Sequence, residues 1–280
     1  MNKNIEEKVI SDFGREWTSF DQVELSEKEL FNTFQKYFSI FPFGEISTDA
    51  EGFDMGCGSG RWARFIAPVV GKLHCIEPSA QACEVAKKNL CSFENCFFYH
   101  ATVDKISLPE NSMDFGYCLG VLHHVSKTQN GINKCVTLLK PGAPFLLYLY
   151  YAFDNKPAWF RVIWKTSDIL RKAVCIMPYP IKYLLCQLIA LFVYFPLART
   201  ALLLEQSSLK ITNFPLSSYR NKSFYTMRTD ALDRFGTRLE KRFTQVQIKE
   251  MMVEAGLENI VFNQQEPYWC AVGYKPQPCI

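Results

Sequence analysis

Three glycines at alternate positions, Gly56, Gly58 and Gly60, constrain the fold of this chain more than any other feature of its sequence. A short apolar run at 52–55 leads into them, and a helix-like pattern at 62–67 follows. This order predicts a strand, a tight turn and a helix N-terminus, where glycine lets the backbone bend and a ligand come close. Because a helix start carries unpaired N–H groups and partial positive charge, the turn predicts a site for a nucleotide-like ligand.

The spacing of these glycines separates two kinds of nucleotide site. A dinucleotide-binding fingerprint reads G-x-G-x-x-G, whereas here the third glycine comes one residue early and Arg61 stands in the last position. Residues 54–62, D-x-G-x-G-x-G-R-W, instead resemble motif I of the class I S-adenosylmethionine (SAM) methyltransferases. The resemblance implies SAM as cofactor, with the loop around its methionine part. It assigns cofactor contacts to Asp54, Gly56, Cys57, Gly58, Gly60 and Trp62.

An acidic residue ends the next predicted strand. Residues 72–77 have the pattern of a strand that ends on Glu77, with Pro78 after it. Glu77 follows the first loop glycine by about 20 residues, the distance at which an acid meets ribose hydroxyls in folds of this kind. We therefore expect Glu77 to bind the ribose and Pro78 to lie beside it. The alternative is a glycine loop that caps a helix and binds no ligand. The position of Glu77, at the distance expected for a ribose contact, disfavours this alternative.

The composition indicates a globular protein without a bias toward nucleic acid. At 280 residues the chain can hold one large domain, or one domain with an insertion. A net charge of +3 is too small to make nucleic acid the default partner. Eleven cysteines without a C-x-x-C pair, and an N-terminus without an apolar signal core, favour reduced thiols and a cytoplasmic location.

Residues 51–155 and 244–280 predict one α/β domain. Apolar strand patterns alternate with amphipathic helix patterns, which is typical of a parallel sheet with helices on both faces. Helix 244–255 and two hairpin strands would close it. The expected fold is a Rossmann-like, seven-stranded, mostly parallel sheet with an antiparallel last strand and a mainly helical insertion. The expected elements are strands 51–56, 72–77, 96–101, 113–119, 143–150, 258–263 and 267–274, and helices 60–69, 79–90, 128–139 and 244–255.

Residues 1–50 predict a helical N-terminal segment, with one helix over 26–41 that starts at Ser26. Before it, Trp17 and Phe20 belong to an aromatic cluster that needs a place to bury. They either pack on the core or, as the family resemblance implies, close over the cofactor as a lid. In the second case Trp17 also contacts the substrate.

The ends of the third and fourth strands carry the other expected cofactor contacts. By register with the family, Thr102 and Val103 flank the adenine, although the family often has Asp-Ala there. A threonine hydroxyl could still serve the adenine amino group. The segment from Leu119 to His123 resembles the family stretch that borders the transferred methyl group.

Two adjacent histidines follow the fourth strand. His123 and His124 are poorly spaced to chelate one metal ion, so we expect no metal site. A histidine pKa suits a general base, and His123, His124 and Tyr150 are the candidates; the alternative is one packed and one solvated histidine. Tyr151, at the aromatic end of the fifth strand, is expected to line the acceptor pocket.

Residues 156–243 form an insertion, which we expect to cap the site and bind the acceptor. Its first half predicts helices at 157–174 and 180–204, and residues 183–198 carry no charge. That run is shorter than the about 20 residues of a membrane span. Three roles stay open for this segment: a buried cap helix, a homodimer contact through 180–204, and peripheral contact with a membrane.

The second half of the insertion interleaves arginines, aromatics and hydroxyls over 214–238. Such stretches are usually solvated surface loops. The functional alternative is an acceptor pocket built from Arg220, Lys222, Tyr225 and Arg228, which suit an anionic or hydroxylated molecule.

The resemblance implies SAM-dependent methyl transfer to a small-molecule acceptor, with O- or N-methylation most favoured. One alternative is a catalytically silent SAM-binding or scaffold protein. Another is a membrane-surface methyltransferase that acts on a lipid-like or quinone-like acceptor. Arg61 argues against a nicotinamide oxidoreductase. The fourth strand lacks the N/D-P-P-Y/F motif expected of enzymes that methylate flipped bases.

Overall fold

The computed structural model describes residues 2–22 and 24–278, in two units. The sheet unit comprises the chain up to residue 22, residues 30–152 and the chain from residue 239. The helical unit comprises residues 153–238 together with the short segment that ends at Glu29. The two units are described separately below.

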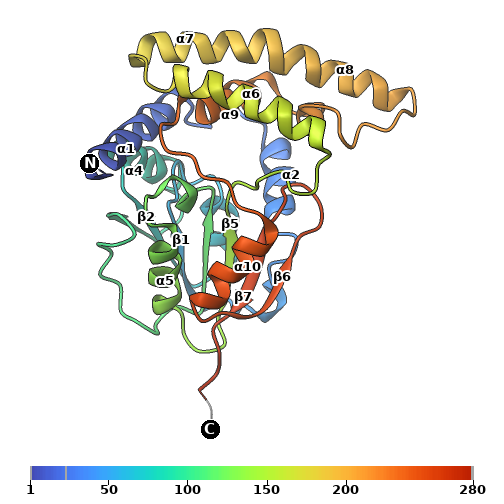
Figure 1. Ribbon diagram of the computed structural model, residues 1–280. Helices are drawn as coiled ribbons and strands as arrows, with labels where there is room; N and C mark the ends of the chain where they lie inside the picture. The colour runs from blue at the N-terminus through green and yellow to red at the C-terminus, as the bar shows by residue number, and fades with distance from the viewer. Residues whose placement is uncertain (1, 23, 279–280) are drawn as a thin grey trace. The chain divides into compact units, whose positions relative to one another are not determined.

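The sheet has seven strands in the order β3-β2-β1-β4-β5-β7-β6 (Figure 1). All pairs are parallel except β5–β7 and β6–β7, which are antiparallel. This confirms the predicted fold. The strands are β1 Glu51–Met55, β2 Lys72–Glu77, β3 Cys96–His100, β4 Phe115–Leu119, β5 Pro144–Tyr148, β6 Glu258–Phe262 and β7 Ala271–Tyr274.

The order of the strands reverses between β1 and β4, which are neighbours although β2 follows β1 in the chain. A ligand crevice forms at such a switch point, outside the carboxyl ends of the strands. Apolar side chains fill the middle of the sheet, and the rings of Phe53 on β1 and Phe145 on β5 lie 6.1 Å apart and are fully buried. The rigid core thus fixes the strand ends that carry the predicted site.

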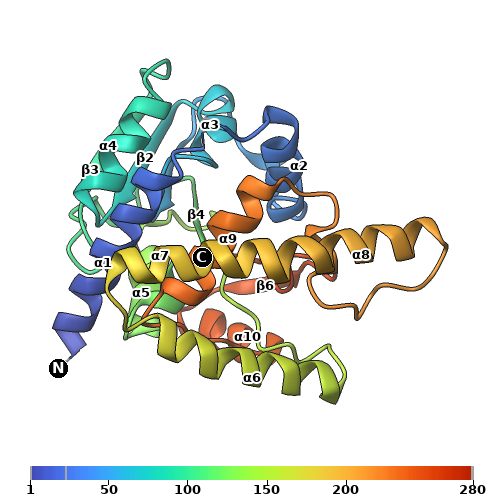
Figure 2. The same ribbon diagram turned by 90° about the horizontal axis from the view of Figure 1, so that it is seen from above.

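Helices flank the sheet, with α1 packed on α4 and α5 packed on α10 (Figure 2). Hydroxyl caps begin two of these helices: the Ser79 hydroxyl accepts the N–H of Ala82, and Thr244 and Gln247 form a reciprocal capping box. The helices are α1 Asn2–Ser19, α2 Glu27–Tyr37, which crosses the boundary between the units, α3 Ala63–Ile66, α4 Ala80–Asn89, α5 Thr128–Leu138 and α10 Gln245–Glu254.

The helix expected at 60–69 is much shorter. α3 covers four residues and passes into a 3₁₀ turn, η2 Ala67–Val69. Gly60 has a φ of +78°, outside the helical region, and Pro68 has no N–H to continue the α-helical ladder. The long loop 56–62 therefore keeps its own conformation instead of winding into the helix.

The helical unit contains α6 Ala158–Val174, α7 Tyr179–Ile189, the π turn η4 Ala190–Tyr194, α8 Phe195–Gln206, η5 Ser217–Tyr219 and α9 Phe224–Gly236. The segment from α7 to α8 is one continuous helix of 28 residues. α9 corrects the expectation of a solvated loop over 214–238. Ser223 caps it by accepting the N–H of Thr226. The buried side chains of α9 recur at helical spacing, and they are Met227, Ala231, Leu232 and Phe235.

Candidate active site

The carboxylate of Glu77 is buried at the end of β2 and holds the glycine loop in place. One of its oxygens accepts the backbone N–H of Gly58 at 2.9 Å, and the other accepts that of Ser79 at 2.9 Å. Burial raises the pKa of Glu77 to about 7, although these two N–H groups stabilise the charged form. The acid thus stands beside the loop where the sequence predicts a ribose contact.

The loop after β1 has the conformation that its glycines predict. Gly56, Gly58 and Gly60 have φ values of +83°, +56° and +78°, which side chains rarely tolerate. Space is also short, because a Cβ at Gly56 would lie 2.4 Å from the side chain of Val121. The loop therefore lies directly against the segment that follows β4.

Several buried polar atoms near the loop have no hydrogen-bond partner among the described residues. They are Asp54 Oδ2, Ser59 Oγ and Thr102 Oγ1. Burial raises the pKa of Asp54 to about 8, although the neighbouring Tyr117 hydroxyl stabilises its charged form. Because buried polar groups are normally paired, the Ser59 and Thr102 hydroxyls indicate a ligand. An amino acid, a ribose and an adenine together offer the donors and acceptors that such atoms need, so these residues fit SAM.

Helix α1 covers both the glycine loop and the end of β4. The indole of Trp17 lies so close that a Cβ at Gly58 would approach it to 3.0 Å. Farther along the helix, the ring of Phe13 lies 4.9 Å from that of His124. The Glu6 carboxylate accepts the Ser126 N–H at 2.9 Å. α1 therefore packs over the glycine loop, where Trp17 lies against Gly58, and over the segment after β4. Its role as a lid stays a prediction.

His123 is fully buried just after β4, within an aromatic cluster. Its ring stacks on that of Tyr150 at 3.7 Å and lies 3.9 Å from that of His124. Burial, together with the nearby His124 and Arg242, holds the pKa of His123 well below its usual value. Neither ring nitrogen has a partner in the described part of the chain. His123 is thus a neutral imidazole with an open acceptor nitrogen.

A returning segment at 239–243 fixes this cluster. Its backbone pairs with two strand ends, since Lys241 N–H donates to the carbonyl of His123 at 3.1 Å and Phe243 N–H donates to that of Tyr150 at 2.9 Å. The carbonyl of Leu239 lies 2.6 Å from Nδ1 of His124. The guanidinium of Arg242 lies 5.0 Å from the centre of the Tyr150 ring. The segment thereby locks His123, His124 and Tyr150 together.

Residues 53–147 match the methyltransferase domain model Methyltransf_11. The chain therefore carries a class I SAM-dependent methyltransferase domain of this family. Solved methyltransferase structures share the fold over nearly the whole chain. A chain from the Haloferax volcanii complex of a methyltransferase with the Trm112 activator has 12% identity and a TM-score of 0.56, over 95% of this chain and 98% of that one. A Thermotoga maritima SAM-dependent methyltransferase has 13% identity and a TM-score of 0.53, over 95% and 99%.

A curated relative is more similar in sequence over a shorter stretch. It is the tRNA N(3)-cytidine methyltransferase METTL2 of Xenopus tropicalis, with 32% identity over 134 residues. These residues are 43% of this chain and 39% of that relative, so the chain spans well under half of the relative's length.

The other predicted cofactor residues lie around the methyltransferase loop. Trp62 packs its ring 5.1 Å from that of Tyr37, and the Cys57 thiol is buried, which raises its pKa to about 12. The carbonyl of Pro78 lies 3.0 Å from Nε2 of His100. The two remaining residues are apolar contacts with the core, Val103 and Leu119.

The residues predicted to bind the acceptor divide between the two units. Tyr151, in the sheet unit, forms a β-bridge with Phe243, and its ring lies 5.4 Å from that of Tyr268. In the helical unit Arg220 forms an ion pair with Glu205 at 2.7 Å. The remaining two belong to α9: Arg228 donates to the side chains of Gln187 and Tyr183, and the carbonyl of Tyr225 accepts the hydroxyl of Thr229 at 3.1 Å. Their substrate role stays a prediction.

Sequence reasoning missed three parts of the site. Ser59 contributes a fully buried hydroxyl within the loop, and a serine between glycines gave no distinct signal. Asn89 donates to the carbonyls of Asp21 and Ser59 at 2.9 and 3.0 Å, and so connects α4 to the end of α1 and to the loop. The segment 239–243 reads as a polar connection. Over residues 2–22 and 24–278, no group of three or more His, Cys, Asp and Glu side chains is placed to hold a metal ion.

Proposed function

We propose that this protein transfers a methyl group from SAM to a small-molecule acceptor, at an oxygen or a nitrogen atom. The observation that carries the proposal is His123. It is a buried, neutral imidazole with an open nitrogen, and it follows Val121, whose side chain lies against Gly56 of the glycine loop, by two residues. A protein that only binds SAM has no need of such a group.

The residues divide into holding and reacting groups. Asp54, Ser59 and Thr102 would bind polar atoms of SAM, and the carboxylate of Glu77 would accept the ribose hydroxyls. Bound SAM supplies an activated methyl group, so the protein acts mainly by alignment. Because its imidazole is neutral, His123 can accept the proton that a hydroxyl or amine acceptor loses. The stacked ring of Tyr150 holds that imidazole in place.

Two other acceptor classes remain candidates. Similarity to a tRNA N(3)-cytidine methyltransferase over 134 residues favours RNA as the second candidate. The net charge of +3 gives no strong electrostatic reason for it. A lipid-like or quinone-like acceptor at a membrane surface is the third. We propose a cytoplasmic setting in all three cases, as the sequence predicts.

Labelled SAM separates these candidates. Purified protein is incubated with SAM tritiated at the methyl group and with metabolite, lipid or RNA extracts from cells that lack the gene. Label in the metabolite fraction supports a small-molecule acceptor. Label only in the RNA or the lipid fraction shows that the acceptor belongs to that class instead. If calorimetry shows SAM binding but no fraction is labelled, the protein is catalytically silent. If SAM does not bind, the proposed function is wrong.

A further inference from the structure

Large apolar side chains cover the outer faces of the helical unit. On α6 the most exposed are Val162 and Ile169, with exposed fractions of 62% and 70%. Ile176, just after α6, is 68% exposed, and Phe192 on the long helix is 70% exposed. A water-facing surface of this kind marks an interaction site. The other large exposed apolar residues of these two helices are Trp159, Ile163, Leu170, Ile181, Leu184, Leu188, Leu191, Val193, Phe195 and Leu203.

The same long helix packs its other face inside the unit. Its fully buried residues recur at spacings of three and four, and α7 packs on α9. Arg199 also donates to the carbonyl of Arg220 at 2.9 Å. These contacts hold the helix along its length. The buried positions are Lys182, Cys186, Ala190, Tyr194, Ala198 and Ala201.

This helix, residues 179–206, is the one in the described part of the chain that is long and apolar enough to cross a membrane. Its mean hydropathy reaches 1.8, and 28% of that window is buried. To span a bilayer it would have to leave α9 and expose the buried face with Lys182. An orientation parallel to a membrane surface keeps that packing and buries the exposed side chains.

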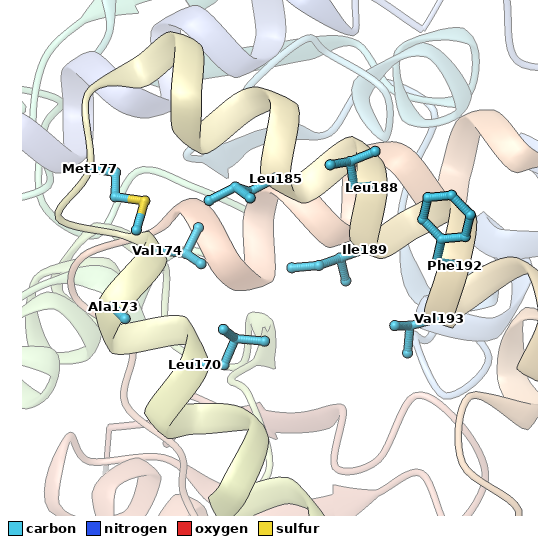
Figure 3. Close-up of a pocket in the computed structure, with 9 residues that line it drawn as sticks. All are labelled: Leu170, Ala173, Val174, Met177, Leu185, Leu188, Ile189, Phe192 and Val193. Atoms are coloured by element: carbon cyan, nitrogen blue, oxygen red, sulfur yellow. The ribbon is translucent and has the colours of Figure 1, made fainter.

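A wholly apolar groove opens between α6 and the long helix, with a volume of about 320 Å³. Figure 3 shows Leu170 and Val174 on the α6 side, facing Leu185 and Ile189 across the opening. The groove offers no side chain that can form a hydrogen bond, so it suits hydrocarbon. The remaining lining residues are Ala173, Met177, Leu188, Phe192 and Val193.

Basic residues border the apolar face of α6. Arg161, Lys165 and Lys172 are exposed, and their spacings of four and seven place them on one stripe of the helix. The two acidic residues between 158 and 206 are Asp168, which pairs with Arg171 and Lys172, and Glu205, which pairs with Arg220. Arg161 and Lys165 lie outside these ion pairs, so the surface combines apolar side chains with an excess of positive charge. This combination is typical of helices that lie on anionic lipid.

We propose that the helical unit docks on the surface of an anionic phospholipid bilayer through α6 and the α7–α8 helix. The apolar side chains enter the acyl region, the groove takes hydrocarbon, and Arg161, Lys165 and Lys172 contact the headgroups. In a two-fold dimer through the same face, the basic residues of α6 would face the same residues of the second copy, and their like charges would repel. The charge thus favours lipid over a second copy of the chain.

Vesicle sedimentation tests this proposal with the purified full chain. We expect binding to vesicles of phosphatidylglycerol and phosphatidylcholine in equal parts, and much weaker binding to phosphatidylcholine alone. The double change Ile169→Glu and Phe192→Glu should reduce the bound fraction at least tenfold. Replacing Arg161, Lys165 and Lys172 by Ser leaves the apolar face intact and should weaken binding to anionic vesicles on the order of a hundredfold.

Matched controls lie in the sheet unit. Val246 and Val253 on α10 are 64% and 55% exposed, so the double change Val246→Glu and Val253→Glu adds the same charge elsewhere. Serine at Lys88, Lys105 and Lys249 removes three exposed charges outside the surface. The proposal is overturned if the native protein ignores anionic vesicles, or if these controls lose as much binding. If light scattering shows a dimer that Phe192→Glu dissociates, the surface is a contact between two copies of the chain and the proposal is wrong. If protein in cell membranes resists carbonate extraction, the long helix spans the bilayer and the proposal is wrong.

Discussion

The carboxylate of Glu77 lies 2.9 Å from the backbone nitrogen of Gly58, which connects the end of β2 to the loop after β1. Its other oxygen accepts the N–H of Ser79, at the N-cap of α4. One buried side chain therefore orients the glycine loop and the start of the next helix. Outer lone pairs on both oxygens are still available for ribose hydroxyls.

Replacing Glu77 by Gln should weaken SAM binding by about tenfold to a hundredfold. A glutamine has one acceptor oxygen, so one of the two N–H groups would face an NH₂ donor and lose its bond. Titration calorimetry measures the effect, and Glu84→Gln on the exposed face of α4 is the control. Equal affinity in the two variants would contradict the proposed ribose contact.

The affinity for SAM should rise with pH. Burial raises the pKa of Glu77 to about 7, so at pH 6 most of the ligand-free protein carries a protonated acid there. Ribose hydroxyls donate hydrogen bonds to the charged carboxylate. Below that pKa, Glu77 must therefore release its proton when SAM binds. We expect the ionisation of Glu77 to lower the dissociation constant about tenfold from pH 6 to pH 8. Calorimetry in two buffers of different ionisation enthalpy should show proton release at pH 6.

Gly58 has two independent reasons to be glycine. Its φ of +56° strains any residue with a Cβ, and that Cβ would lie 3.0 Å from the Trp17 indole. Gly58→Ala should therefore abolish measurable SAM binding. Trp17→Ala alone should weaken binding moderately, because it uncovers the loop. In the double variant the steric conflict disappears but the backbone strain remains, so affinity should recover only in part. Full recovery would show that the indole contact alone excludes alanine.

The sheet unit was predictable because its signals are local. Each signal lies within about 25 residues of the chain. The signals are the alternating strand and helix patterns, the hydroxyl caps Ser79 and Thr244, and the spacing from Gly56 to Glu77. The resemblance to motif I then added the ligand. Both kinds of evidence depend on chain order, which a single sequence displays directly.

The parts that were missed depend on contacts between distant residues. The sequence predicts a loop in place of α9 because Arg228, Thr229 and Asp230 interrupt its apolar pattern, and its buried stripe is explained by packing on α7, η4 and α6. The segment 239–243 returns to His123 over more than a hundred residues. Its backbone pairing leaves no mark in its own sequence. This segment pairs with the backbone of His123, the proposed base.

Replacing His123 by Leu tests whether this buried imidazole is a base. Leucine fills much of the same apolar space beside Tyr150, so the domain should fold and bind SAM within about twofold of the native affinity. If the imidazole accepts the acceptor's proton, turnover with the extract fraction that the native protein methylates should fall by about 10²- to 10⁴-fold. The rate of S-adenosylhomocysteine formation measures this. Because the pKa of His123 is well below its usual value, the native rate should not decline between pH 8 and pH 6 through protonation of this group. Unchanged turnover together with a lower melting temperature would assign His123 to packing alone.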